Sequence, residues 1–349
     1  MSEHTIETIG CDLGDKMSAI FLIAADGKTA RDRVKTTRAS MEEFFRRPRA
    51  HVVIEVGTHS RWVSHLLKEQ GHQVTVANPR RVKAISESDT KTDRADAELL
   101  ARLGRADVHL LAPIRHREQR AQVDLAVLKA RDALVSSRTK LVNHVRGVVK
   151  SFGERLPACT AESFHRRTRL LVPQSLKPAL EPLFQALEAI DQQIRSLERS
   201  VETMAKSYPD SDVLAQVHGV GTLTAMAFLL TVEDKKRFTK SRMAGAFLGL
   251  RPRTDQSGDG DPQLRITKAG DPFLRRLLVN SANHILGPFG KDSDLRQWGL
   301  ELAKRGGKNA RKRAKVAVAR KLAVLLHRLW VTGEVYQPVG YRKRRSAAA

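Results

Sequence analysis

Two apolar segments of this chain each end in an acidic residue, and this pairing restricts the possible folds more than any other feature of the sequence. Asp12 closes the segment TIETIGCD, and Glu55 closes AHVVIE. A carboxylate at the end of a buried strand needs a partner, because a charged group that leaves water alone is costly. Two such strands in one region predict a shared site at the edge of a β-sheet.

Two further acids, Asp93 and Asp96, lie in the segment KTDRADAELLA. They are three residues apart on an expected helix, a spacing that places both carboxylates on one helix face. With Asp12 and Glu55 they supply four hard oxygen donors, which suit Mg²⁺. We therefore expect a magnesium site, with two ions roughly 4 Å apart that stabilise the attacking and leaving oxygens of a phosphodiester.

The residues alone leave other interpretations of these acids open. Asp12, which precedes Leu-Gly, could cap a turn or could belong to the phosphate-binding loop of an actin-like kinase. Asp93 and Asp96 could be solvated residues at the start of a helix. Three histidines near Glu55 lack the spacing of zinc ligands and are interpreted as structural, namely His59, His65 and His72.

The net charge indicates what such a site would act on. The chain of 349 residues has 62 Lys and Arg against 38 Asp and Glu, a formal charge of +24, which is typical of nucleic-acid-binding proteins and not of a sugar kinase. Two cysteines, Cys11 and Cys159, form neither a disulfide framework nor a zinc motif. Since we find no signal peptide and no apolar run that could span a membrane, we expect a soluble protein of the cytoplasm that is not associated with a membrane.

The order of the expected elements indicates the fold of the first domain. Strands are expected within residues 6–14, 17–27, 30–37, 51–57 and 72–79, and helices near residues 40–48, 60–69, 80–85 and 95–104. The order is βββαβαβα. With acids ending the first and fourth strands and more acids on a late helix, this is the arrangement of the RNase H-like nuclease fold. We therefore predict an α/β domain over residues 1–112.

The rest of the chain is predicted to be mostly α-helical. Residues 113–207 are expected to form a coiled-coil region, in which a long amphipathic helix is followed by a second helix with a heptad seam from Leu180 to Met204. The two helices could pair as an internal hairpin or join subunits, and we favour a homo-oligomer, a dimer or tetramer. Residues 208–340 are expected to form a helical C-terminal domain, and residues 341–349 a basic tail.

Two features of the C-terminal region favour contacts with nucleic-acid phosphates. Gly219 and Gly221 lie between two apolar helical stretches, the pattern of a helix-hairpin-helix element that grips a phosphate backbone; an ordinary tight turn is the alternative. Residues 301–349 are strongly basic, and such a charge excess would repel itself without phosphates. The candidate contacts there are Lys308, Arg311, Lys312 and Arg313.

A resemblance to a known family rests on six segments, which are CDLG, IEVGTHSRW, KTDRADAELLA, HGVGTLTAMAFL, FLGLRPRTDQSG and ITKAGDPFLRRLL. Together they resemble the DEDD insertion-sequence transposases, the family numbered one hundred and ten, over nearly the whole chain. The resemblance implies a first domain similar to the Holliday-junction resolvase RuvC, then a coiled coil, then a domain with a catalytic serine. Carried over by position, the four acids of that family match Asp12, Glu55, Asp93 and Asp96, and its serine matches Ser257.

The resemblance also implies a function, since members of that family are recombinases guided by a bridge RNA. We therefore expect an enzyme that cleaves and rejoins donor and target DNA with Mg²⁺ and Ser257, together with a structured guide RNA. The cations that flank Ser257 could stabilise a phosphoryl transition state or contact the backbone, namely Arg251, Arg253, Arg265 and Lys268. Arg265 departs from the family pattern, in which a glycine is common there.

Two alternatives from other classes remain. One is a metal-dependent, structure-selective endonuclease that resembles Holliday-junction resolvases and hydrolyses branched DNA, with Ser257 only a turn residue. The other is a non-catalytic protein that binds RNA or DNA.

Overall fold

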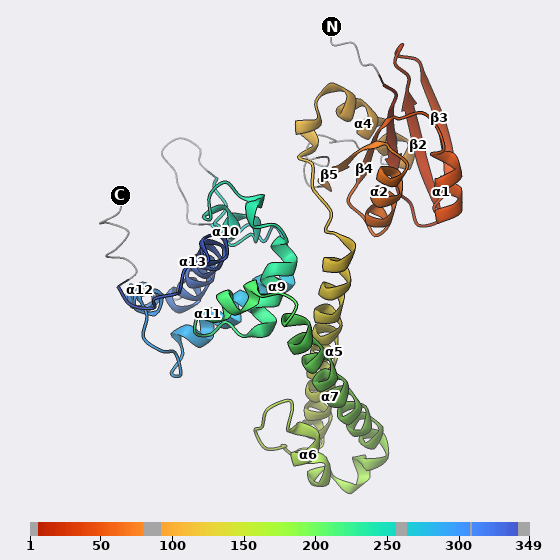
Figure 1. Cartoon of the computed structure of the whole chain (residues 1–349). Helices are drawn as coiled ribbons and strands as arrows, with labels where there is room; N and C mark the ends of the chain where they lie inside the picture. The colour runs from red at the N-terminus through yellow and green to blue at the C-terminus, as the bar shows by residue number, and fades with distance from the viewer. Residues whose placement is uncertain (1–5, 80–81, 83–91, 256–263, 308, 341–349) are drawn as a thin grey trace. The chain divides into compact units, whose positions relative to one another are not determined.

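The chain folds as two units, Met1–His116 and Arg117–Ala349 (Figure 1). The structure is a computed structural model and describes residues 6–79, 82, 92–255, 264–307 and 309–340. Each unit has its own buried apolar core. The chain is therefore of mixed α/β type in its first unit and helical in its second.

A mixed β-sheet is the centre of the first unit. Its strands are β1 (Thr8–Asp12), β2 (Met17–Ile23), β3 (Thr29–Lys35), β4 (His51–Glu55) and β5 (Gln73–Ala77). They are arranged in the order β3-β2-β1-β4-β5. β1 is antiparallel to β2 and parallel to β4, β2 is antiparallel to β3, and β4 is parallel to β5. The five strands expected from the sequence are confirmed.

Helices cover both faces of this sheet. They are α1 (Arg38–Phe44), α2 (Ser60–Glu69) and α4 (Asp93–Ala106), followed by a 3-10 turn, η1 (Val108–Leu111). Residues of a strand alternate between the two faces. Ile9 and Cys11 of β1 pack towards α1 and α2, whereas Ala19 and Phe21 of β2 pack against Ala97 of α4. The helix expected near residues 80–85 falls largely outside the described residues.

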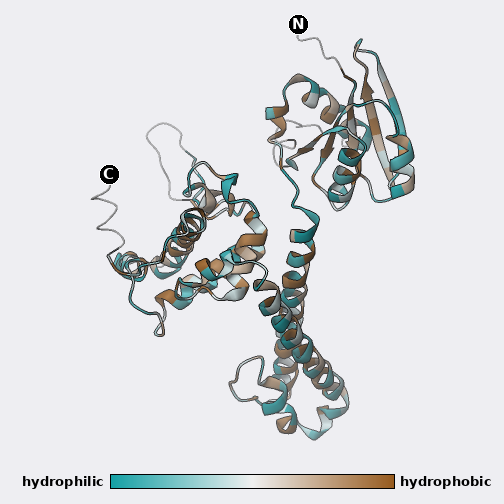
Figure 2. Cartoon of the chain, in the orientation of Figure 1, coloured by the Kyte–Doolittle hydropathy of each residue, from teal (hydrophilic) through white to brown (hydrophobic). Residues whose placement is uncertain are grey.

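The second unit begins with a long helical hairpin. Its helices are α5 (Gln119–Ser151), α6 (Phe164–Thr168), α7 (Lys177–Ala205), α8 (Asp210–Ala215), α9 (Thr222–Val232), α10 (Met243–Phe247), α11 (Pro272–Leu286), α12 (Asp294–Lys304) and α13 (Ala310–Thr332), with short 3-10 turns η2 (Arg169–Leu171), η3 (Gln174–Leu176) and η4 (Lys235–Arg237). α5 and α7 pack side by side, and Figure 2 shows both apolar and polar residues along each of them.

The heptad seam of α7 is used within the chain. Leu180 and Leu187 are buried in one apolar cluster with Val142 and Val145 of α5, and Ile194 farther along α7 is also buried. Of the two arrangements that the sequence leaves open, the internal hairpin is therefore the one that covers this seam.

A buried ionic cluster also joins the two helices of the hairpin. Arg138 Nη1 of α5 donates to Asp191 Oδ1 of α7 at 2.6 Å, and His165 Nδ1 of α6 lies 3.0 Å from Asp191 Oδ2. All three residues are buried. Burying a charge in this way requires a partner of opposite sign, so the cluster fixes how α5, α6 and α7 align.

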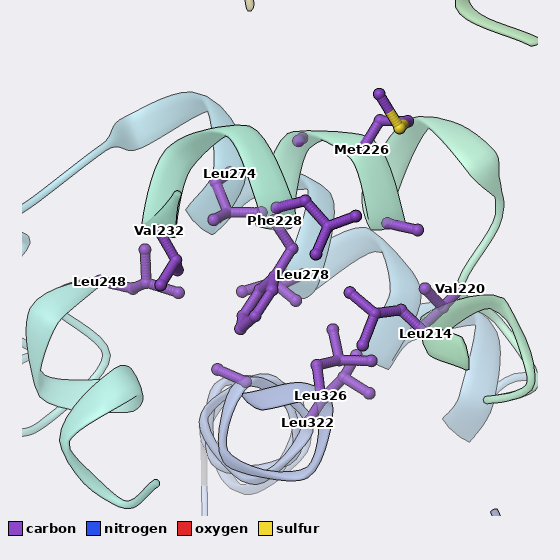
Figure 3. Close-up of a cluster of buried hydrophobic side chains, with 14 of the residues drawn as sticks. Leu214, Val220, Met226, Phe228, Val232, Leu248, Leu274, Leu278, Leu322 and Leu326 are labelled. Atoms are coloured by element: carbon purple, nitrogen blue, oxygen red, sulfur yellow. The ribbon is translucent and has the colours of Figure 1, made fainter. Parts of the chain in front are cut away.

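The main core of the second unit lies around α9. This helix is apolar on all sides, and residues 224–232 are all buried, as expected of a helix surrounded by protein. Figure 3 shows Phe228 of α9 among Leu278 of α11 and Leu322 and Leu326 of α13. The described part of the chain contains no helix long and apolar enough to cross a membrane.

Candidate active site

The two acidic strand ends lie side by side. β1 and β4 are parallel neighbours, and their register makes Asp12 and Glu55 the next adjacent positions after the last pair of the ladder. Both side chains are half-buried. By alternation, Asp12 lies on the same face as Gly10, and Glu55 on the same face as Val53. Gly10 contacts α4 and Val53 contacts its Gly104, so both acids belong to the α4 face of the sheet.

Helix α4 crosses this face antiparallel to β1. Near its start, Ala97 lies directly on Gly10. In its last turn, Arg105 donates a hydrogen bond of 3.2 Å to the carbonyl oxygen of Ile23, which pairs with Thr8 at the beginning of β1. The first turn of α4 therefore lies at the carboxyl ends of β1 and β4.

Asp93 and Asp96 occupy that first turn. The helix begins after Thr92, whose Oγ1 accepts a hydrogen bond of 3.3 Å from the backbone N–H of Ala95. A Thr cap followed by acids in the first turn is favourable, because the acids meet the positive end of the helix dipole. Asp93 is exposed and Asp96 is half-buried. The sequence that starts the helix is thus also the sequence that supplies the acids.

The helix acids and the strand acids reach the same level. Asp93 is four residues before Ala97, about 6 Å along a helix that rises roughly 1.5 Å per residue. Asp12 is two residues beyond Gly10, about 7 Å along a strand that rises roughly 3.3 Å per residue. Since Ala97 lies on Gly10, the two rises bring Asp93 level with Asp12. Asp93 therefore lies at the same end of the sheet as Asp12 and Glu55, on the α4 face, and Asp96 belongs to the same first turn of the helix.

The donor set fits a hard divalent cation, although the acids are not drawn together into a ligand shell. Within the described residues, no three His, Cys, Asp or Glu side chains are close enough to hold a metal ion. Carboxylate oxygens are nevertheless the ligands that Mg²⁺ prefers.

Cys11, next to Asp12, plays no part in such chemistry. It is fully buried on the opposite face, and burial, followed by the charge of neighbouring Asp12, raises the pKa of its thiol far above the ordinary range. A neutral buried thiol is neither a nucleophile nor a ligand. Cys11 and Cys159 are both free thiols, as the sequence predicts.

The nearby histidines are engaged in structural contacts. His72 is buried, accepts a hydrogen bond of 3.1 Å from the backbone N–H of Ala50, and bonds the carbonyl oxygen of Phe45 at 2.8 Å. His59 accepts from Trp62 Nε1 at 3.1 Å. The structural interpretation of these two histidines is confirmed.

A second group of predicted residues flanks the segment that contains Ser257. Ser257 itself lies outside the described residues, as does all of 256–263. The described residues on either side of it pair: Arg253 N–H donates to the carbonyl oxygen of Arg265 at 3.0 Å, and Thr267 N–H donates to that of Arg251 at 3.0 Å. The three arginines are exposed. The two hydrogen bonds thus bring together arginines from two separate segments of the chain.

The chain segments around these two hydrogen bonds are tightly packed. A Cβ atom on Gly249 would meet the backbone oxygen of Ala269 at 2.1 Å, and Gly249 has a φ of +67°. Its carbonyl oxygen accepts from the N–H of Lys268 at 3.1 Å. Arg275 donates to the carbonyl oxygen of Ala269 at 2.9 Å. Lys268, another predicted contact, is exposed beside these residues.

The glycine turn before α9 is the third predicted feature. Gly219 has a φ of +90° and packs against Ile285 of α11, where a Cβ atom would approach Ile285 Cγ1 to 3.0 Å. Gly221 is exposed and immediately precedes α9, and no described side chain caps the helix there. The first N–H groups of α9 therefore have no side-chain acceptor among the described residues, as is also true of α5 and α13.

The basic C-terminal segment is partly described. Lys308 lies outside the described residues. Arg311, Lys312 and Arg313 are exposed in the first turn of α13, and the same helix buries Val318 and other apolar residues farther along. The start of α13 therefore presents cations while its continuation forms core.

Two glycines that position the site were not among the residues predicted from the sequence. Gly10 lets the backbone of α4 touch β1, and Gly104 lets it touch β4, where a Cβ atom would meet Val53 Cγ2 at 2.4 Å. A glycine inside an apolar strand often marks a close backbone approach, and this signal could have identified Gly10.

Comparison with known proteins gives consistent matches to both units. Residues 9–153 match a family model of DEDD transposases of the IS110 type, and residues 211–293 match a model described as the transposase IS116/IS110/IS902 family. The transposase for insertion sequence element IS1111A of Coxiella burnetii is 32% identical over 276 residues, which cover 76% of this chain and 74% of that protein.

Two other relatives extend the comparison. The transposase for insertion sequence element IS1328 of Yersinia enterocolitica is 29% identical over 282 residues, 79% of this chain and 83% of that protein. A protein of Moraxella bovis named as a pilin gene-inverting protein is 24% identical over 281 residues, 79% of this chain and 78% of that protein.

Proposed function

The chain belongs to the IS110 family of transposases, enzymes that cleave and join DNA strands, and from this premise we propose that it is a DNA recombinase guided by RNA. In this proposal the four acids hold Mg²⁺ and Ser257 attacks the DNA backbone. The observation that supports it most is the position of Asp12 and Glu55 at the end of the sheet where the first turn of α4 carries Asp93 and Asp96. Family membership sets aside the kinase and the non-catalytic interpretations.

The first unit would act as the metal-binding part, with an RNase H-like fold similar to RuvC. In support, its strand order is β3-β2-β1-β4-β5, with acids at the ends of the central pair β1 and β4. Mg²⁺, when bound, would stabilise the charge on the attacking and leaving oxygens, for which two ions are suited. The chain's own part is to hold the acids on a sheet and a helix.

The second unit would supply the nucleophile. Ser257 Oγ would attack a DNA phosphorus and lose its proton, while the bond to the leaving sugar oxygen breaks and that oxygen takes up a proton. The phosphoserine link keeps the energy of the broken bond, so a sugar hydroxyl can reverse the step and rejoin strands. Arg251, Arg253 and Arg265, whose backbones are joined by two hydrogen bonds of this region, would bind the phosphoryl oxygens.

Rejoining, and not only hydrolysis, is favoured by one relative. The Moraxella bovis protein is named for inverting a gene, and inversion of a DNA segment requires every cut end to be joined again. A serine link would serve this purpose in the present chain. The structure-selective endonuclease is the alternative, in which water replaces Ser257 as the attacking group.

Nucleic-acid backbones would contact several further surfaces. We assign Gly219 and Gly221 to a helix-hairpin-helix element whose uncapped helix start binds phosphate. Lys268 and the start of α13 would add cations, and the net charge of +24 supports a large polyanionic partner. That partner would be a structured guide RNA together with donor and target DNA at the bacterial nucleoid.

The domain division and assembly of the chain belong to the same proposal. We divide it into residues 1–112, 113–207, 208–340 and 341–349, the second being an intramolecular coiled coil. Strand exchange needs more than one active site, so we propose a dimer or tetramer. Light scattering of the full chain with RNA would give a monomer mass if this is wrong.

Covalent trapping tests the serine. The full chain with its copurified RNA and Mg²⁺ is incubated with labelled DNA that spans an end of its own element, then denatured and separated by electrophoresis. We expect a protein–DNA adduct that is absent in Ser257→Ala and retained in Ser175→Ala, an exposed serine of the hairpin. Cleavage that persists in Ser257→Ala without any adduct would identify the endonuclease instead.

Sequencing of copurified nucleic acid tests the guide. One structured RNA encoded beside the gene should remain after a high-salt wash, because shape and 2′-hydroxyl contacts outlast purely ionic ones. Recovery of only mixed cellular RNA that washes off at moderate salt would refute guidance.

A further inference from the structure

The edge strand β3 places cations on the same face as the acids. Arg33 pairs with Ala19 of β2, which pairs with Asp12 of β1, so the three side chains lie in one row across the sheet. Ala19 is buried against α4, which identifies the face. Lys35, two residues farther along, lies on this face too. Strands are about 4.8 Å apart, so Arg33 begins about 10 Å from Asp12.

Helix α4 adds a third cation to this group. Glu98 bonds Arg31 of β3 at 2.8 Å and Arg102 Nε at 2.8 Å, so this stripe of α4 faces β3. Arg94 is four residues before Glu98 and belongs to the same stripe. Arg94 lies about 6 Å from Glu98 along the helix, and Arg33 lies about 6 Å from Arg31 along the strand. Both displacements run towards the carboxyl ends of β1 and β4. Arg94 is therefore level with Arg33.

The charges along this stripe are satisfied at one end and not at the other. Arg31 and Arg102 share the carboxylate of Glu98 and lie over the ring of Phe21, each with Cζ 5.7 Å from the centroid. Three exposed cations lie at the other end, namely Arg33, Lys35 and Arg94. Among the described residues, none of them has an acidic side chain within ion-pair distance. Unmatched cations thus gather at the end next to the acids.

We propose that Arg33, Lys35 and Arg94 form a phosphate-binding track that holds one DNA strand beside the four acids. The proposal rests on the proposed function, in which the cleaved phosphate lies at Asp12 and Glu55. A separation of about 10 Å corresponds to a rise of roughly three nucleotides along the axis of a duplex, at about 3.4 Å per nucleotide. The DNA strand would run across the carboxyl ends of the β-strands from β4 towards β3. The cleaved bond would lie at the acids, and the neighbouring phosphates would lie on the track.

DNA suits this track better than the guide RNA does. Acids repel phosphates unless a cation intervenes, so a cleavage site made of carboxylates has no affinity of its own for a strand. Cations a few nucleotides away would supply this affinity for the strand without contacting the ligands of Mg²⁺. Phosphate contacts of this kind position a strand and do not read its sequence, as an enzyme that takes its specificity from a guide requires.

Salt-dependent binding of the full chain to a labelled DNA duplex tests the track. The variant with Arg33→Gln, Lys35→Gln and Arg94→Gln should bind more weakly, and the slope of log affinity against log salt should fall by about 2 to 3 units, since each contact contributes roughly 0.9. The single change Arg33→Gln should lower it by about 1 unit. Unchanged thermal unfolding midpoints would show that the variants fold.

A matched control removes the same charges from the other side of the sheet. Arg46, Arg49 and Lys68 are exposed residues of the α1 and α2 side, and their joint replacement by Gln should leave the slope unchanged. Equal losses in the two triple variants would overturn the proposal, and so would a loss seen with a structured RNA probe and not with DNA. This assay measures DNA binding and does not depend on cleavage. The proposed metal site is tested independently, by the loss of cleavage in Asp12→Asn.

Discussion

Gly10 of β1 and Ala97 of α4 are in direct backbone contact: a Cβ atom built on Gly10 would lie 2.0 Å from the carbonyl oxygen of Ala97. No side chain separates helix from strand at this point. The contact sets the height of α4 above the sheet and, through it, the position of Asp93 and Asp96 relative to Asp12. The geometry of the acidic edge therefore depends on a residue that carries no functional group.

Replacing Gly10 by Ala should push α4 away from the sheet. We expect a loss of about 1 to 3 kcal/mol in the free energy of unfolding, as for other overpacked sites. DNA cleavage should fall by about 100-fold or more, because a misplacement of about 1 Å can cost this much. Gly147→Ala is the control, since Gly147 lies within α5 with open space around it; that change should preserve cleavage. Full activity in Gly10→Ala would contradict the assigned role of this contact.

The acids themselves should separate catalysis from binding. Asp12→Asn and Asp96→Asn each remove one anionic donor, so Mg²⁺-dependent cleavage should drop by more than about 100-fold, while DNA affinity stays the same or rises. Glu42→Gln, on exposed helix α1, is the matched control. Cleavage is followed on labelled DNA over a range of Mg²⁺ concentrations. If both Asn variants cleave at the normal rate, the four acids do not form a shared site.

The buried cluster of the hairpin should be sensitive to loss of its anion. Asp191→Ala leaves Arg138 buried without its main partner, and breaking a buried pair in this way costs about 3 to 5 kcal/mol. The urea midpoint followed by circular dichroism should fall accordingly. Glu162 lies 3.7 Å from Arg138 but is largely exposed, so Glu162→Ala should change stability by less than about 1 kcal/mol. Equal effects of the two changes would exclude a special role for Asp191.

His327 should make the second unit less stable in mild acid. Burial lowers the pKa of its imidazole, although a hydrogen bond to the carbonyl oxygen of Lys235 opposes the shift. The unfolded chain then binds the proton more readily, so stability present above about pH 6.5 is lost as pH falls through the lower, folded-state pKa. His327→Gln should reduce the difference in urea midpoint between about pH 7.5 and about pH 5.5. His109→Gln, at an exposed position, should keep it.

Much of the first unit could be predicted because its signals are local. Apolar runs bounded by turns specify the strands, and acids such as Asp12 and Glu55 stand out against them. The relation between Arg33 and Arg94 could not be predicted, because it depends on strand register and on the height of α4. These are set by packing between distant segments, and one slipped residue would turn Arg33 to the other face.

The second unit shows the same limit in another form. A heptad seam such as Leu187–Ile194 predicts that a helix will be covered but does not say by which partner. Here Val142 and Val145 of α5 supply the cover, since the connection between the helices is long enough for α7 to fold back on α5. The role of Ser257 stays a prediction, because it rests on the resemblance and on the cations that flank it in sequence.

Strand β3 has one unpaired side, because it is the outer strand of the sheet in the described residues. Open strand edges invite other chains to add to them, which is a common route to aggregation. β3 is exposed along almost its whole length and carries charges at four of its seven positions, which are Arg31, Asp32, Arg33 and Lys35. Charged side chains along an open strand oppose the addition of a further strand, so this edge can remain uncovered without promoting aggregation.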